Sequence, residues 1–331
     1  MKASKIGLVF SVLALACFLC ACAETAPVAK SDKKTTIRLG SPFKQGHILV
    51  DAAEKFKELA KQRSGGTIDV QFDVGTKSEE EVNKLNSAGT LAMQSNGTMY
   101  IEKFAPAYYF VSAPYVMKDF DHYMRVWNGK LGQQAQVEMA KNGNLKFLGS
   151  INRGVRQTTA KKPLYTPADV YNLKLRLPVL PTWVAIWKAI GADPVPLPLT
   201  ELYAGLKSGK ADASEGDVSQ ITSFKLDEVQ THLVMTNHMV TIGGLLIHKP
   251  FFDGLSKTEQ DIIVQAAKEA CDWANAKMKA TESSYLLELQ RKGMQVVIPD
   301  AESFRAKAKP AVDELFKTQW SVTTWAEVLA Q

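Results

Sequence analysis

The body of this chain has almost no cysteine. The sequence of 331 residues contains four, and three of them, Cys17, Cys20 and Cys22, stand near the amino terminus. Only Cys271 belongs to the rest of the chain, so a disulfide within that part is excluded. Because Cys271 sits among alanines on a helical pattern, we expect a small buried side chain and not a reactive thiol.

Motifs that carry catalysis or hold phosphates and metals are absent as well. The chain has no G-x-S-x-G elbow, no P-loop, no G-x-G-x-x-G turn and no H-E-x-x-H helix. The five histidines, which lack any metal-ligand spacing, are His47, His122, His232, His238 and His248. We therefore expect neither enzymatic activity nor a bound metal or cofactor.

The charge pattern argues against a nucleic-acid partner. The formal net charge is +6, and the shares of hydrophobic residues (46%) and charged residues (22%) are those of an ordinary soluble protein. Lysines are interleaved with acids, as in Glu54-Lys55-Phe56-Lys57-Glu58, and no basic stripe with aromatics occurs. The sequence predicts a mildly cationic, solvated surface.

Residues 1–22 have the pattern of an export signal. Two lysines precede an apolar run at 6–19, and small residues follow. Two ways of processing stay open: cleavage at an Ala-x-Ala site, or a lipoprotein signal with Cys22 as the acylated residue. The polar stretch 23–35 suits a flexible tether. We predict a periplasmic protein that touches the membrane only through such a lipid anchor.

Helical and strand-like patterns alternate from Thr36 onward, which predicts an α/β fold. Ser256-Lys257-Thr258-Glu259 is a capping box, and the helical pattern that it opens runs to about Arg291, beyond ordinary length. Such a helix can brace two lobes. We expect two α/β lobes with more than one crossover and a hinged ligand cleft between them.

Arginines stand at the ends of strand-like segments. Arg176 ends the apolar stretch 174–177, directly before Pro178. A guanidinium at this place is a fork for a carboxylate, and burying one without a partner is costly. The competing explanation is a fixed ion pair with an internal Asp or Glu, and spacing alone favours it.

Four further charges belong to the same region. Arg153 and Arg156 are expected in a polar turn after a strand at 145–148, where one of them could contact an anion or both could be solvated. Glu215 and Asp217 flank a glycine and could accept hydrogen bonds from hydroxyl or ammonium groups of a ligand. Their alternative role is the acidic start of the following helix.

Three other side chains are candidates for the wall of the cleft: Trp183, Phe43 and Asn96. Trp183 and Trp187 share one helical face, and such a pair usually belongs to a core. Trp183 is nearer the strand end and is the better candidate of the two. Phe43 follows the first strand and Asn96 the third, where the loops of both should meet the cleft.

Five motifs occur in order along residues 36–310, and they are Gly154-Val155-Arg156-Gln157-Thr158-Thr159, Leu175-Arg176-Leu177-Pro178, Gly191-Ala192-Asp193-Pro194-Val195-Pro196, Glu201-Leu202-Tyr203-Ala204-Gly205-Leu206 and Met235-Thr236-Asn237-His238. With them the chain resembles the solute-binding proteins of tripartite ATP-independent periplasmic (TRAP) transporters, the C4-dicarboxylate-binding (DctP-like) type. Any one motif alone is weak, and their linked order makes the resemblance specific.

The resemblance implies a binding protein that closes on an organic acid and delivers it to membrane permease subunits. It implies that Arg176 forms a bidentate salt bridge with the ligand carboxylate, and that Arg156 assists. It also implies chain crossovers near Arg153, near Thr241 and in the middle of the long helix. The implied division is lobe I, 36–153 plus 242–281, and lobe II, 154–241 plus 282–331.

The chain departs from the family pattern at two places. After Arg176-Leu177-Pro178 many relatives have Asn or another polar residue, and here Val179 stands. Where many relatives read Q-E-N-P, this chain reads Ser214-Glu215-Gly216-Asp217. The site has lost amides and gained a carboxylate. We therefore expect, in place of a plain C4 dicarboxylate, a monocarboxylate whose polar, hydroxylated or cationic tail faces Glu215 or Asp217.

Two other functions stay open at this point. Glu215 and Asp217 could form the acid/base pair of a secreted hydrolase, which turnover of glycosides or esters would reveal. The same clamp could also act as a sensor that presents its ligand to a membrane receptor. Neighbouring genes for two membrane subunits would favour transport over sensing.

Overall fold

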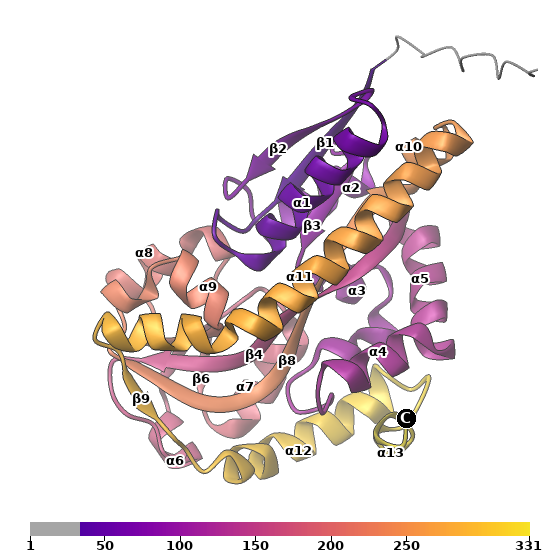
Figure 1. Cartoon of the computed structure of the whole chain (residues 1–331). Coiled ribbons are helices and arrows are strands. Elements are labelled where there is room, and N and C mark those ends of the chain that lie inside the picture. The colour runs from indigo at the N-terminus through magenta and orange to yellow at the C-terminus, as the bar shows by residue number, and fades with distance from the viewer. Residues whose placement is uncertain (1–33) are drawn as a thin grey trace, which may run out of the picture. The chain divides into compact units, whose positions relative to one another are not determined.

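Nine strands form one mixed sheet in the computed structural model, which describes residues 34–331 (Figure 1). Their order is β2-β1-β3-β8-β4-β7-β5-β6, and β9 pairs with β8. The strands are β1 Thr35–Ser41, β2 Ile68–Val74, β3 Met93–Asn96, β4 Leu145–Ala160, β5 Lys174–Leu177, β6 Asp193–Pro196, β7 Ala213–Asp217, β8 His232–His248 and β9 Gln295–Val297.

Helices connect these strands, so the predicted α/β class is confirmed. The α-helices are α1 Ile48–Arg63, α2 Glu79–Ser87, α3 Met99–Phe104, α4 Phe120–Asn128, α5 Lys130–Gly143, α6 Pro167–Val170, α7 Pro181–Ile190, α8 Leu202–Lys207, α9 Val218–Ser223, α10 Lys249–Asp253, α11 Lys257–Arg291, α12 Ala301–Thr318 and α13 Trp325–Leu329. Three 3₁₀ turns are η1 Pro106–Ser112, η2 Leu199–Glu201 and η3 Leu226–Glu228. None of the helices within 34–331 has the length and apolarity needed to cross a membrane.

The long helix α11 begins where its capping box predicts. The Ser256 hydroxyl accepts a hydrogen bond from the Glu259 amide, and the Glu259 carboxylate accepts one from the Ser256 amide. Each side chain thereby satisfies an amide that the first helical turn leaves unpaired. The helix then runs for 35 residues and packs against α1 and β4.

Strands β4 and β8 are much longer than the sequence suggested. The predicted strand at 145–148 exists, but β4 continues through Arg153 and Arg156 to Ala160, and β8 extends over 17 residues. The expected polar turn after residue 148 is therefore wrong. Antiparallel pairing with β8 satisfies the backbone of this segment, and most of its polar side chains are buried in a polar site instead of facing water.

A β-bulge in β4 determines which side of the sheet its two arginines face. Between Asn152 and Gly154 the pairing advances two residues on β4 but one on β8, so Arg153 is an extra residue. Gly154 has a φ of 84°, a left-handed conformation that favours glycine. In a regular strand, residues three apart face opposite sides of the sheet. The extra residue brings Arg153 and Arg156 to the same side.

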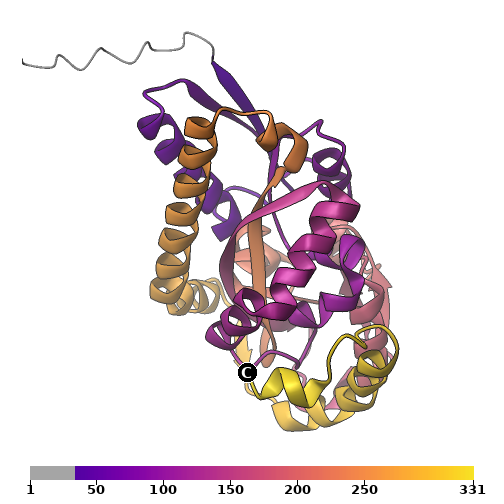
Figure 2. The same cartoon turned by 90° about the vertical axis from the view of Figure 1, so that its right-hand side faces the viewer.

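Apolar clusters cover both sides of the long strands. One cluster contains Ile48 and Phe56 of α1 together with Ala266, Ala270 and Cys271 of α11. The other gathers around the buried rings of Trp127, Trp187 and Trp320. Figure 2 shows α11 on one side of the long strands and α5 on the other. The prediction that Cys271 is a buried side chain is confirmed.

The β4–β8 pair joins two smaller sets of strands. Near its carboxyl end β8 pairs with β3, which leads to β1 and β2. Near its own carboxyl end β4 pairs with β7, which leads to β5 and β6. Since β4 and β8 are antiparallel, these sets lie at opposite ends of the pair. The residue bounds of lobe I and lobe II stay a prediction.

Gly243 tests how tightly β8 packs at the centre of the sheet. A Cβ there would lie 2.6 Å from Leu49 Cδ2 and 2.7 Å from the Asn96 carbonyl oxygen. The backbone carbonyl cannot give way, so Gly243→Ala should lower the free energy of unfolding by about 1–3 kcal/mol in urea titration. Gly254→Ala is the control, because its nearest atoms are 3.5 Å away, and it should change stability by less than about 0.5 kcal/mol.

Candidate ligand cavity

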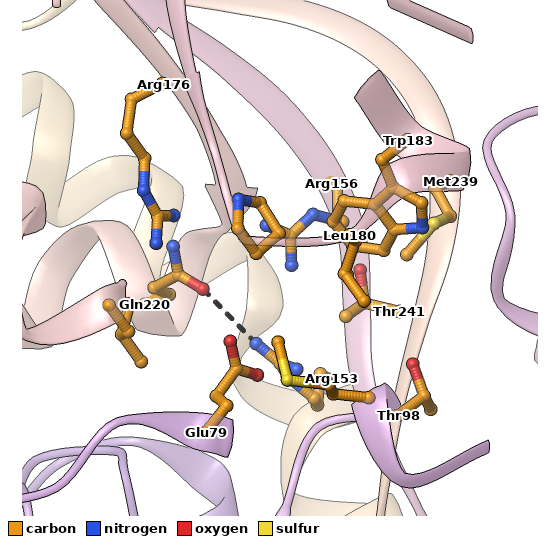
Figure 3. A pocket seen from close by; sticks show the side chains of 13 residues that line it. Glu79, Thr98, Arg153, Arg156, Arg176, Leu180, Trp183, Gln220, Met239 and Thr241 are labelled. Atoms are coloured by element: carbon orange, nitrogen blue, oxygen red, sulfur yellow. Dashed lines mark hydrogen bonds between the residues drawn. The ribbon is translucent and has the colours of Figure 1, made fainter. Parts of the chain in front are cut away.

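A polar cavity lies beside the bulge of β4, with about 360 Å³ of space between its atoms, part of it open to solvent. Three arginines point toward it, and one carboxylate reaches in from α2 (Figure 3). Its lining comes from segments far apart in the sequence: Glu79, Thr98, Met99, Arg153, Arg156, Arg176, Pro178, Leu180, Trp183, Leu199, Gln220, Met239 and Thr241.

Arg176 is a buried cation without a carboxylate partner within the described chain. Its residue is 1% exposed, and its Nε and Nη2 donate to the carbonyl oxygen of Leu197 at 3.0 and 2.6 Å. Burial lowers the pKa of Arg176 to about 10, against the opposing charges of Glu215 and Glu79. The fixed internal ion pair that could have explained this arginine is not formed.

Arg156 has such a partner. Its Nη2 donates to Glu215 Oε1 at 2.8 Å, and its Nε donates to Glu215 Oε2. His238 Nε2 lies 3.1 Å from the same Oε2, and its Nδ1 lies 2.9 Å from the Thr236 hydroxyl. The Arg156 guanidinium also lies 4.9 Å from the centre of the Trp183 ring, a cation–π distance.

Arg153 has the second buried carboxylate. Its Nη2 donates to Asp217 Oδ2 at 2.7 Å, and its guanidinium lies 4.5 Å from the centre of the Phe43 ring. The other carboxylate oxygen of Asp217 accepts from the Gln220 amide at 2.9 Å and so caps α9. The N-cap of α1, His47, has its Nε2 3.6 Å from Asp217 Oδ1.

Both carboxylates are held ionised. Burial by itself raises the pKa of Glu215, but Arg156 and His238 outweigh it and bring the pKa down to about 2. Burial likewise opposes ionisation of Asp217, and Arg153 and His47 take its pKa well below the ordinary range. Neither group carries a proton at neutral pH, so neither can act as a general acid. Their charges neutralise Arg156 and Arg153 instead.

Glu79 is the carboxylate that the sequence did not single out. It is the first residue of α2, and Figure 3 shows it pointing toward Arg153 and Gln220. Burial of the carboxyl raises the pKa of Glu79, against the lowering effect of Arg153, Arg176 and Arg156. An acid after a serine N-cap is a common helix start, so its sequence pattern alone carries no functional signal.

Three cavity residues have a buried polar atom with no hydrogen-bond partner within residues 34–331. These atoms are Nε of Arg153, Nε2 of Gln220 and Oγ1 of Thr241. Orphaned buried polar groups cost about 1–3 kcal/mol each, so native proteins rarely keep them without a purpose. A bound molecule with several acceptors would satisfy them.

The predicted site residues divide into two sets. Arg176, Arg156 and Trp183 line the cavity. Behind the lining lie Glu215, Asp217, Phe43 and Asn96, which orient or neutralise other side chains. The hypothesis that a ligand tail faces Glu215 or Asp217 does not match this arrangement, because the two carboxylates are turned to Arg156 and Arg153. Cys22 and the predicted export signal lie outside the described residues.

A family model describes nearly the whole chain. It is the model of the bacterial extracellular solute-binding proteins, family 7 (DctP), and it matches residues 39–319. The chain belongs to this family. Family 7 comprises the solute-binding proteins of TRAP transporters, so the resemblance seen in the sequence motifs is confirmed, and the protein is a binding protein and not an enzyme.

Individual relatives agree with this assignment. A TRAP periplasmic solute-binding protein of Roseobacter denitrificans, solved with bound L-galactonate, is 27% identical with a TM-score of 0.82, covering 88% of this chain and 99% of that one. A Polaromonas protein bound to D-erythronate is 25% identical with a TM-score of 0.83, covering 90% and 99%. The sialic acid-binding periplasmic protein SiaP of Vibrio cholerae is 28% identical, over 86% of this chain and 90% of its own.

No three His, Cys, Asp or Glu side chains gather closely enough in the described part of this family 7 protein to hold a metal ion. The cavity lining itself contains three arginines and one glutamate. Arg156 and Arg153 are neutralised by their carboxylates, so Arg176 and Glu79 determine the net charge of the cavity. The raised pKa of Glu79 favours its uncharged form, which makes that net charge more positive. The cavity is electrostatically suited to an anion.

Beside the cavity, Glu102 of α3 caps the start of α7. Its Oε1 accepts from the Thr182 hydroxyl at 2.9 Å and from the Thr182 amide at 3.4 Å. Burial raises the pKa of Glu102 from 4.5 to about 6, although these hydrogen bonds act in the opposite direction. The folded protein therefore binds the Glu102 proton more tightly than the unfolded chain does.

This difference makes stability depend on pH. The contribution of Glu102 is fully present below about pH 4.5 and is lost as the pH rises through 6, and a shift of this size corresponds to about 2 kcal/mol. Urea unfolding should show the wild type losing about that much stability relative to Glu102→Gln between pH 4.5 and 7.5. If the free energies of unfolding of the two proteins changed with pH in parallel, the raised pKa of Glu102 would be contradicted.

Proposed function

We propose that this chain captures a small organic acid and delivers it to the membrane permease subunits of a TRAP transporter. The observation that supports this most is Arg176, a buried guanidinium beside the cavity with no carboxylate partner in the described chain. A ligand carboxylate would complete its set of charge-assisted bonds. The export signal and the periplasmic relatives support capture in the periplasm.

The neighbouring charges are arranged so that they support Arg176 without competing for the ligand charge. Glu215 neutralises Arg156, and Asp217 neutralises Arg153. Both guanidiniums still face the cavity and can donate to neutral acceptors such as hydroxyl groups. Arg176 is then the guanidinium left to meet a ligand carboxylate.

Capture would use a hinged closure of the two predicted lobes. Lobe I would be 36–153 plus 242–281, and lobe II would be 154–241 plus 282–331. Among the contacts that span that division beside the cavity, Trp183 Nε1 donates to the Ser112 carbonyl oxygen at 2.9 Å, and Thr182 donates to Glu102. These bonds exist only when the segments are close. A ligand that binds the closed form more tightly would shift the population toward it.

The ligand class that fits best is a monocarboxylate with a hydroxylated tail. The tail would face Glu79, Gln220 and Thr241, which can exchange hydrogen bonds with hydroxyl groups. A second carboxylate at that end would meet the Glu79 carboxyl and be repelled when it is ionised. L-Galactonate and D-erythronate, the bound molecules of two relatives, are hydroxylated monocarboxylates.

Removal of the anchor should weaken binding strongly. Arg176→Ala leaves the ligand carboxylate without its cation, and we expect a loss of about 2–5 kcal/mol in binding free energy for the tightest organic acid found by calorimetry. Arg63→Ala is the matched control, because Arg63 forms an exposed ion pair with Glu269 far from the cavity. An Arg176→Ala protein with wild-type affinity would place the anchor elsewhere.

A ligand panel tests the tail. D-Erythronate and L-galactonate should bind at least about tenfold more tightly than succinate or malate, because only the hydroxylated monocarboxylates avoid the second charge at Glu79. Glu79→Gln should reduce this preference by removing the repulsion. Calorimetry in which succinate or malate binds more tightly than every monocarboxylate tested would overturn the proposed class.

A further inference from the structure

A second polar pocket is lined in part by β8, beside the β8 residues that line the ligand cavity. Met239 and Thr241 of β8 line the ligand cavity, whereas Thr236, Asn237, His238 and Val240 line this pocket. We call it the hinge groove, and it has about 820 Å³ of space between its atoms, part of it open to solvent.

The walls of the hinge groove come from segments far apart in the chain. One wall is the loop with Tyr115, Met117 and Lys118, and the opposite wall is the start of α12 with Glu302 and Arg305. Figure 1 shows α12 crossing below the lower ends of the long strands. By the predicted division these walls belong to different lobes, with the connecting strands as the floor.

Tyr115 is the residue whose unpaired hydroxyl and backbone conformation indicate a ligand site. It is 7% exposed, and its hydroxyl is buried without a hydrogen-bond partner in the described chain. Its φ is 67°, a left-handed conformation that is unusual for a bulky side chain, and its amide donates to the His238 carbonyl oxygen at 2.7 Å. Strained backbone and an orphaned donor at one residue are typical of binding sites.

The charges around Tyr115 favour an anion. Arg305 has Glu302 as its nearest ion-pair partner, at 3.9 Å on an exposed helix face, which is a weak contact. Lys118 at the rim donates to the Leu329 carbonyl oxygen at 2.8 Å, so its charge is not neutralised there. Arg305 and Lys118 are two cations and Glu302 is one anion, so the net charge of the groove lining is positive. Burial raises the pKa of Tyr115, so its hydroxyl remains a donor.

The remaining lining is polar at Thr236, Asn237 and His238 and otherwise apolar. Met117, Val155 and Val240 form the surface beside the charged groups. A molecule that fits this combination has a carboxylate at one end and a short hydrocarbon part at the other. An inorganic oxyanion would satisfy Arg305 but would leave the apolar surface unused.

We propose that the hinge groove is a second binding site, which takes a small amphiphilic monocarboxylate on Arg305 and the Tyr115 hydroxyl. The site does not depend on the ligand of the first cavity. Its floor is nevertheless connected to that cavity, because His238 contacts Glu215, and Glu215 holds Arg156. A carboxylate in the groove would therefore sit one side chain away from the ion pair that supports the first site.

Butanoate is the probe, since it has the carboxylate and the short apolar part but no hydroxyl. The titration uses ¹⁵N-labelled full-length protein carrying Arg176→Ala, so that the first cavity lacks its anchor. Up to about 20 mM butanoate should move the amide signals of Asn237 and Ala301 in a saturable way. Absence of saturable shifts at these amides would overturn the proposal.

Three variants in the same background locate the contacts. Arg305→Gln should weaken butanoate binding about tenfold or more, and Tyr115→Phe should weaken it several-fold while the protein stays as stable as before. Arg38→Gln, on the exposed side of β1, is the matched control and should bind like the parent. Unchanged binding in Arg305→Gln, or in Tyr115→Phe, would contradict the assignment of these donors.

A second titration separates an amphiphilic acid from a simple oxyanion. Inorganic phosphate should bind at least about tenfold more weakly than butanoate, because it leaves the apolar surface unused. Phosphate that binds as tightly as butanoate, or more tightly, would show that the groove is an oxyanion site of another class. If Arg176 is not the anchor of the first cavity, the effect of Arg305→Gln still decides whether the groove is occupied.

Discussion

Burial of a guanidinium without an opposite charge is the constraint on which this site depends. The free energy of removing a cation from water is large, and a single carbonyl oxygen recovers only part of it. Arg176 is held in this condition by Leu197, and its lowered pKa reflects the cost. Arg156 and Arg153, by contrast, are each neutralised by a buried carboxylate. The cavity thus reserves one positive charge for a guest.

The long strand pair explains how distant segments meet at that charge. β4 and β8 connect two sets of strands, and a bulge in β4 brings two arginines to one side that regular pleating would have separated. Residues of the same strands also line the hinge groove. Two sites that share a floor are physically linked through His238 and Glu215, whether or not both are used together.

Sequence reasoning reached the fold class, the long helix, its capping box and the family, because these depend on local patterns and on linked motifs. It misjudged the extent of β4: polar residues such as Arg153 and Gln157 resemble a turn until their buried partners are known. It also assigned Glu215 and Asp217 to the ligand, although their partners are arginines on a neighbouring strand. Glu79 was missed, because its helix start looks like any other.

The sequence by itself determined that a strand-end arginine and a set of linked family motifs belong to one solute-binding protein. Only the tertiary structure decided which charges cancel. Ion pairing depends on distances between segments as far apart as Arg153 and Asp217, or Arg156 and Glu215, and no local pattern encodes those distances. The pairing leaves Arg176 as the unmatched cation and places Glu79 at the far end of the same cavity.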